Sequence, residues 1–151
     1  MTTTLTQKII LFISGATAVG IGAAILAVPI AFHATNGIAL GDNTSLLSEI
    51  RAPGGALLTM GLFMLAGLLR QRLAGFSLAV GAAVFLSYGL SRCIAIAVDG
   101  WPEQGLVAAA VIELVIGASC VFGWLGWRRA TGRAGLLVLL GTWGAKKVAA
   151  R

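Results

Sequence analysis

Apolar residues occur in four long runs along the chain, at about 9–32, 46–69, 75–98 and 105–127, and short polar segments separate them. Each run is close to the roughly 20 residues that a helix needs to cross about 30 Å of hydrocarbon. Backbone polar groups in lipid must be satisfied within their own segment, so the runs are predicted to be helices. They are too apolar for the alternating strands of an outer-membrane barrel. The pattern predicts an all-α membrane protein built as a four-transmembrane-helix bundle.

The first run could instead be a cleaved secretory signal. Its apolar part is longer than the roughly 7–15 residues of such a signal, and Phe32 stands where cleavage before Thr35 would require a small residue. We therefore interpret this run as a retained membrane anchor.

The chain after the fourth run is expected to be separate from the bundle. We assign 1–130 to the transmembrane domain and 131–151 to a basic C-terminal tail. Within the tail, the apolar segment 134–145 is too short to span a membrane and has basic flanks. It could lie as a helix in the membrane interface or dock on a partner, or it could be a poorly ordered terminus. Its hydrophobicity favours the first interpretation.

The composition supports a membrane location. Of the 151 residues, 58% are hydrophobic and only 11% are charged, whereas soluble domains carry roughly 25% charged residues. The net charge of +6 does not indicate nucleic acid, because the basic residues are not interleaved with aromatic residues on one polar surface. The lipid bilayer is the expected partner.

The charges between the runs indicate the direction of the helices. Lys8, Arg70, Arg72 and the basic C-terminal residues flank the runs on one side, whereas the other two loops carry only acids, Asp42, Asp99 and Glu103. Short cytoplasmic loops are enriched in Lys and Arg. We therefore predict a multi-pass protein of a bacterial inner membrane with both termini in the cytoplasm.

Four charged residues lie inside or at the edge of the apolar runs: Glu49, Arg51, Arg92 and Glu113. A charge at the bilayer centre costs about 3 kcal/mol on insertion scales, so such residues usually face the bundle interior and find partners. At 1.5 Å per residue, Glu113 lies roughly 14 Å and Arg92 roughly 9 Å below the outer surface. These depths predict a buried pair between the third and fourth helices.

The remaining two charges need partners on other helices. Glu49 and Arg51 are two residues apart, so on a helix they point to different sides and cannot pair with each other. Tyr88 lies one turn before Arg92 on the same face of the third helix. We expect one charge-balanced cluster in the outer half of the bundle, formed by Glu49, Arg51, Arg92, Glu113 and Tyr88.

Pro53, Gly54 and Gly55 follow directly after two of these charges. The ring of Pro53 would clash with the carbonyl of Glu49 in a continuous helix. We therefore predict a helix break here, either a kink or a restart with Pro53 in the first turn. The two glycines would allow another backbone or a ligand to come close.

The sequence indicates neither a metal site nor a cofactor. It has a single histidine, His33, no Cys-x-x-Cys and no glycine-rich phosphate loop. His33, Asn36 and Asp42 are interpreted as ordinary polar loop residues. Cys93 and Cys120 are interpreted as small packing groups, because their predicted depths differ too much for a disulfide. No residue is predicted to be catalytic.

Three motifs carry a resemblance to a known family: L-x-x-E-I-R-A-P-G-G at 46–55, D-G-W-P at 99–102 and I-E-L-V-I-G at 112–117. Over about residues 10 to 130 the chain resembles a family of small bacterial four-span membrane proteins of unknown function, and its architecture is similar to that of DoxX-like proteins. The resemblance implies a four-helix membrane bundle and no established reaction. Small multidrug transporters and glutathione-linked membrane enzymes fit less well, since their characteristic acidic positions are absent.

Three functions remain open. The cluster could hold together an accessory or scaffold subunit that binds a membrane-protein partner or a second copy of itself. It could instead form a site for a lipid, a quinone-like molecule or a transported solute, with Glu113 as a proton-linked acid and Arg51 or Arg92 as an anion anchor. An enzyme has the least support, because no nucleophile–base pair is present. The scaffold interpretation is preferred at this point, and a tightly packed, dry cluster with direct ion pairs would count against the small-molecule site.

Overall fold

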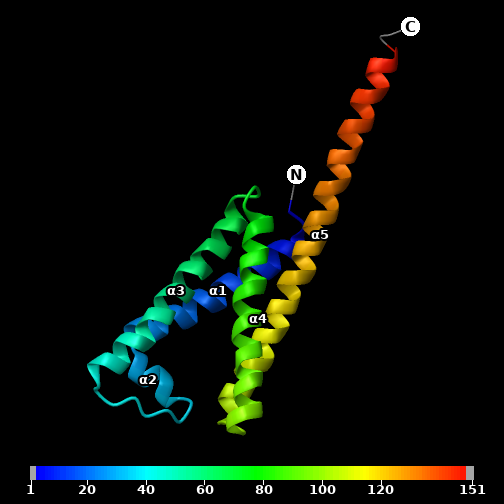
Figure 1. Ribbon diagram of the computed structural model, residues 1–151. Coiled ribbons are helices and arrows are strands. Elements are labelled where there is room, and N and C mark those ends of the chain that lie inside the picture. The colour runs from blue at the N-terminus through cyan, green and yellow to red at the C-terminus, as the bar shows by residue number, and fades with distance from the viewer. Residues whose placement is uncertain (1–2, 149–151) are drawn as a thin grey trace.

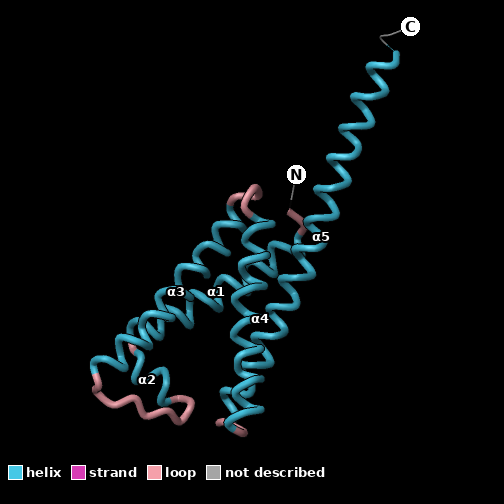
Figure 2. The backbone as a smooth tube through the Cα atoms, in the orientation of Figure 1, coloured by secondary structure: helices cyan, strands magenta, loops and turns pink. Residues whose placement is uncertain are grey.

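The computed structural model describes the backbone of residues 3–148 and the side chains of residues 3–132. It consists of five helices in the order α1 (Leu5–Ala27), α2 (Pro29–Ala34), α3 (Thr44–Leu69), α4 (Ala74–Asp99) and α5 (Gln104–Val148) (Figure 1). The described residues contain no strand, and short loops join the helices (Figure 2). Four segments are long and apolar enough to span a membrane: α1, α3, α4 and the Gln104–Gly132 part of α5. The predicted all-α, four-span architecture is confirmed.

The first apolar run does not form one helix to its end. Helix α1 stops at Ala27, Val28 leaves the helical conformation (φ −134°, ψ 55°), and Pro29 starts α2. Proline has no N–H and its ring excludes the carbonyl four residues earlier, so it suits the first turn of a new helix. The prediction that this span continues to residue 32 is therefore wrong at its C-terminal end.

The predicted restart of the helix at Pro53, Gly54 and Gly55 is also wrong, whereas a kink there, the other form of the predicted break, stays a prediction. Helix α3 begins after Asn43, whose side-chain oxygen accepts a 3.1 Å hydrogen bond from the N–H of Leu46, and it continues through Pro53 to Leu69. Because proline has no N–H, the carbonyl of Glu49 still lacks the donor that residue 53 would normally supply. Thus α3 continues through the proline, and the carbonyl one turn before it has no N–H donor from position 53.

Helix α5 is longer than the fourth apolar run predicts. It continues without interruption to Val148, so its 45 residues extend far beyond the bundle (Figure 1). At 1.5 Å per residue the helix is about 68 Å long, roughly twice the thickness of a bilayer core. Where residues 131–151 lie relative to a membrane stays a prediction, and 149–151 are outside the described residues.

The bundle is assembled from two antiparallel pairs, α1 with α3 and α4 with α5. The helices of the first pair approach very closely. A Cβ on Gly22 would lie 2.7 Å from the carbonyl oxygen of Gly54 and would also meet the backbone of Leu58. Small residues allow membrane helices to come into backbone contact.

The two pairs are held together at the end where Arg70 and Arg72 join α3 to α4, called here the arginine end. There the hydroxyl of Ser77 in α4 donates a 3.1 Å hydrogen bond to the carbonyl of Phe63 in α3. The side-chain amide of Gln7, near the start of α1, donates a buried 3.2 Å hydrogen bond to the carbonyl of Gly123 in α5. These contacts close the bundle at the arginine end.

At the opposite end the two pairs diverge, and α2 with the loop 35–43 crosses the opening (Figure 1). This segment, residues 29–43, is called the lid. Its turn packs against the start of α5, since a Cβ on Gly105 would meet the side-chain oxygen of Asn36. Gly37, in the same turn, has a positive φ of 72° and lies against the side chain of Glu103. The space under the lid is therefore bounded on several sides.

Candidate ligand-binding site

A cavity of about 390 Å³ lies under the lid, between the two helix pairs. All five helices contribute to its wall. Its volume is within the roughly 300–1,000 Å³ of ordinary ligand pockets. Much of the surface is apolar, with Ile21, Ile25, Leu57 and Phe85 among the lining residues. Six polar side chains also line the cavity: His33, Asn36, Glu49, Tyr88, Arg92 and Glu113.

An ion pair joins α4 to α5 at the cavity wall. The Nε of Arg92 donates to the Oε2 of Glu113 at 2.9 Å, with 33% of the Arg92 side chain and 11% of the Glu113 side chain exposed. This pairing is the one that the helix depths predict. Arg92 uses only its Nε here, and its terminal amino groups make no hydrogen bond to the described residues. The pair is formally neutral.

Arg51 lies apart from the other charges. Its Nε donates to the carbonyl of Leu26 at 3.1 Å, in the last turn of α1, and the side chain is exposed. The last carbonyls of a helix have no intrahelical donor, so Arg51 caps α1. The structure brings Glu49, Tyr88, Arg92 and Glu113 to one cavity and leaves Arg51 outside its wall.

The lid contributes two polar residues to the cavity wall, His33 and Asn36, although the sequence pattern predicts that they are ordinary polar loop residues. The Nδ1 of His33 lies 2.8 Å from the carbonyl of Pro29. A carbonyl only accepts, so the Nδ1 of His33 carries a proton. Pro29 was the available signal, because a proline inside an apolar run indicates that the chain turns into a new element.

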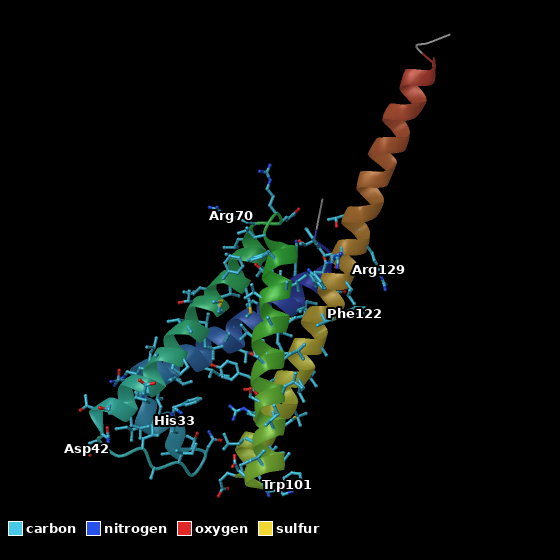
Figure 3. All side chains as sticks on the ribbon, in the orientation of Figure 1. His33, Asp42, Arg70, Trp101, Phe122 and Arg129 are labelled. Carbon is cyan, nitrogen blue, oxygen red and sulfur yellow. The ribbon has the colours of Figure 1, made fainter. Side chains whose placement is uncertain are left out.

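The formal charges are divided between the two ends of the bundle. All five acids of the chain lie toward the lid end, Asp42, Glu49, Asp99, Glu103 and Glu113, together with Arg51 and Arg92. Figure 3 shows His33, Asp42 and Trp101 at this end and Arg70 and Arg129 toward the arginine end. Five acids and two arginines give the lid end a formal charge of −3. Among the described residues, no group of three or more His, Cys, Asp or Glu side chains could hold a metal ion.

Four membrane-spanning helices around a partly polar cavity define a multi-pass membrane protein. The chain belongs to the family described as Domain of unknown function (DUF4345), which matches residues 6–125. The expectation of a family of unknown function is thus confirmed, and the match covers every residue of the cavity wall. Neither the search of curated proteins nor the search of solved structures gave a match.

Proposed function

We propose that this protein binds a small lipophilic molecule in the cavity under the lid. The observation that carries the proposal is the cavity itself, about 390 Å³ bounded by all five helices. A tightly packed, dry cluster with direct ion pairs would count against a small-molecule site. Instead Glu49, Tyr88, Arg92 and Glu113 face a common opening, and this favours the small-molecule alternative.

The wall provides the two kinds of contact that orient an amphipathic molecule. Apolar side chains such as Ile25, Leu57 and Phe85 favour an apolar body, at about 0.8 kcal/mol for each methylene group removed from water. The Arg92–Glu113 pair and Tyr88 offer polar groups for one end of the ligand. A few polar groups in a mostly apolar wall are typical of small-molecule sites.

In the proposed membrane orientation, both termini are cytoplasmic and the cavity lies in the outer half of an inner membrane. The distribution of Lys and Arg supports this orientation. A ligand would then enter from the outer leaflet or from the outer aqueous side, past the lid. The tight contacts at the arginine end would not need to open.

Two neighbouring alanines provide a direct test. Ala109 lines the cavity, whereas Ala108 is exposed on the outside of α5. We expect wild-type protein, purified in a mild detergent, to release a small lipophilic molecule that native mass spectrometry detects. Ala109→Phe fills the cavity and should reduce the bound fraction about tenfold, corresponding to 1.4 kcal/mol. Ala108→Phe adds the same ring on the lipid-facing side and should retain the ligand. Equal retention by two folded variants would contradict the proposal.

A further inference from the structure

The charged groups of the cavity wall specify the kind of ligand. We infer that the cavity accepts a lipophilic cation, meaning an apolar body that carries a protonated amine. This inference rests on the proposed function and adds the chemical class of the ligand to it.

Neither arginine near the site offers a free positive charge to the cavity. Arg92 is held by Glu113 through the 2.9 Å ion pair, so its charge is compensated. Arg51 is turned onto the carbonyl of Leu26, outside the cavity wall. An anionic ligand would therefore have no uncompensated cation in the cavity wall to bind.

Glu49 is the uncompensated charge of the wall. Glu49 lines the cavity and is exposed, and its carboxylate has no ion pair or hydrogen bond with the described residues. Its backbone carbonyl also lacks a donor at position 53, because Pro53 has no N–H. His33 and Asn36 on the lid line the same cavity. An ammonium group has three donors and no acceptor, which matches this set.

Aromatic side chains strengthen the same preference. Phe32 on the lid and Phe85 and Tyr88 on α4 all line the cavity. The faces of aromatic rings attract cations, with about 0.5–2 kcal/mol gained per contact, depending on desolvation. A wall of three rings and one free carboxylate therefore favours a cation over a neutral molecule of the same shape.

The net charge of the whole lid end also favours a cationic ligand. Its formal −3 produces a negative potential at the opening, which raises the local concentration of cations and the rate at which they arrive. This contribution declines with ionic strength, whereas contacts inside the cavity are screened much less.

Three probes with the same alkyl chain separate charge from hydrophobicity: octylamine, octanol and octanoate. Binding is measured by equilibrium dialysis against protein in lipid nanodiscs, with empty nanodiscs subtracted. We expect wild-type protein to bind octylamine about tenfold more tightly than octanol, and octanoate most weakly. Octanol or octanoate binding as tightly as octylamine would overturn the inference and leave the proposed cavity function intact. If Ala109→Phe bound all three probes as tightly as the wild-type protein does, the proposed cavity function itself would be contradicted.

Substitutions at Glu49 identify the source of the preference. Glu49→Gln should reduce the preference for octylamine over octanol to within about threefold, with little change in octanol affinity. Glu49→Asp keeps the charge and should keep most of the preference. Glu103→Gln removes an equal charge from the same end, outside the cavity wall, and should leave the preference near the wild-type value. Thermal unfolding of each variant checks that it folds, and an unchanged preference in folded Glu49→Gln would overturn the assignment.

Discussion

Gly20 and Gly22 lie two residues apart on α1 and have opposite surroundings. A Cβ on Gly22 would enter the backbone of α3, whereas a Cβ on Gly20 would meet nothing within 4 Å. We expect Gly22→Ala to lower the free energy of unfolding by about 1–3 kcal/mol, the usual cost of overpacking. Gly20→Ala should be neutral or stabilising by up to about 1 kcal/mol, because alanine favours the helix. Steric-trapping measurements in micelles check both values, and equal effects would contradict the close contact.

The Arg92–Glu113 pair can be tested separately from the ligand. Replacing one partner of a buried pair leaves a charge without compensation, and Glu113 is the more buried of the two. We expect Arg92→Met to destabilise the bundle by about 2–3 kcal/mol, because it leaves the buried carboxylate of Glu113 without a partner, and Glu113→Leu to cost less, because the Arg92 that remains is one-third exposed. The double variant should regain most of the loss. Additive losses in the double-mutant cycle would show that the pair does not couple α4 to α5.

Individual contacts could be predicted from the sequence only where helix depth alone decides them. Arg92 and Glu113 have similar depths on consecutive helices, so their pairing could be predicted. The position of Arg51 could not, because its partner is a carbonyl that becomes available only where α1 ends. The end of α1 depends on Pro29. The average hydrophobicity of the whole run does not reveal the effect of this proline.

At the scale of the helices, Pro53 has two effects. It lowers the stability of α3, and it leaves the backbone carbonyl of Glu49 without an N–H donor at position 53. An alanine at this position can donate its N–H to the carbonyl of Glu49 and removes the ring clash. We expect Pro53→Ala to raise the free energy of unfolding by about 1–3 kcal/mol. It should also weaken octylamine binding, since one acceptor near the cavity is lost. Lower stability in Pro53→Ala would mean that the ring makes a packing contact that outweighs the restored hydrogen bond.

The lid can be tested by fixing it to α5. The side-chain oxygen of Asn36 lies against Gly105, so Asn36→Cys with Gly105→Cys should form a disulfide in a protein whose native cysteines are replaced by alanine. Oxidation should slow dissociation of a bound probe, and reduction should restore the wild-type rate. Stopped-flow displacement of the probe gives both rates. An equal rate in the oxidised and reduced proteins would show that the ligand leaves by a route that does not involve the lid.

The helices themselves were predictable to different degrees. The apolar runs predict the membrane-spanning segments because burial in lipid imposes both length and composition on them. The lid was not predicted, because α2 is as apolar as the helix before it and only one residue separates the two. Pro53 was expected to interrupt α3, yet the flanking turns keep the helix continuous.

At the scale of the whole molecule, the proposed orientation can be measured with single cysteines. Asp42 is in the lid, and Gln71 is in the turn between α3 and α4. We expect Asp42→Cys to react with a membrane-impermeant maleimide in intact cells, and Gln71→Cys to react only after permeabilisation. The positive-inside distribution of Lys and Arg is the physical reason. The reverse labelling pattern would place the cavity in the cytoplasmic half.

The overall class was predictable, and the cavity was not. Hydropathy predicts how many helices are long and apolar enough to cross a membrane, and the distribution of Lys and Arg predicts their direction. The pairing of the helices depends on where small residues allow close contact, such as Gly22 of α1 against α3 and Gly75 of α4 under Trp127 of α5. Which residues of different helices come into contact is a property of the three-dimensional structure, and a single sequence does not provide it.

The hydrogen bond from Gln7 to the carbonyl of Gly123 has a consequence for biogenesis. Its partners are 116 residues apart, so the amide of Gln7 enters the translocation machinery long before its acceptor is synthesised. At about 5–20 residues per second, ribosomes need roughly 6–23 s to cover that interval. During this time α1 can already pack on α3, but it has a polar side chain without its final partner. The nascent protein therefore passes through a state that membrane chaperones and quality-control proteases can recognise, and the insertion of the last helix ends that exposure.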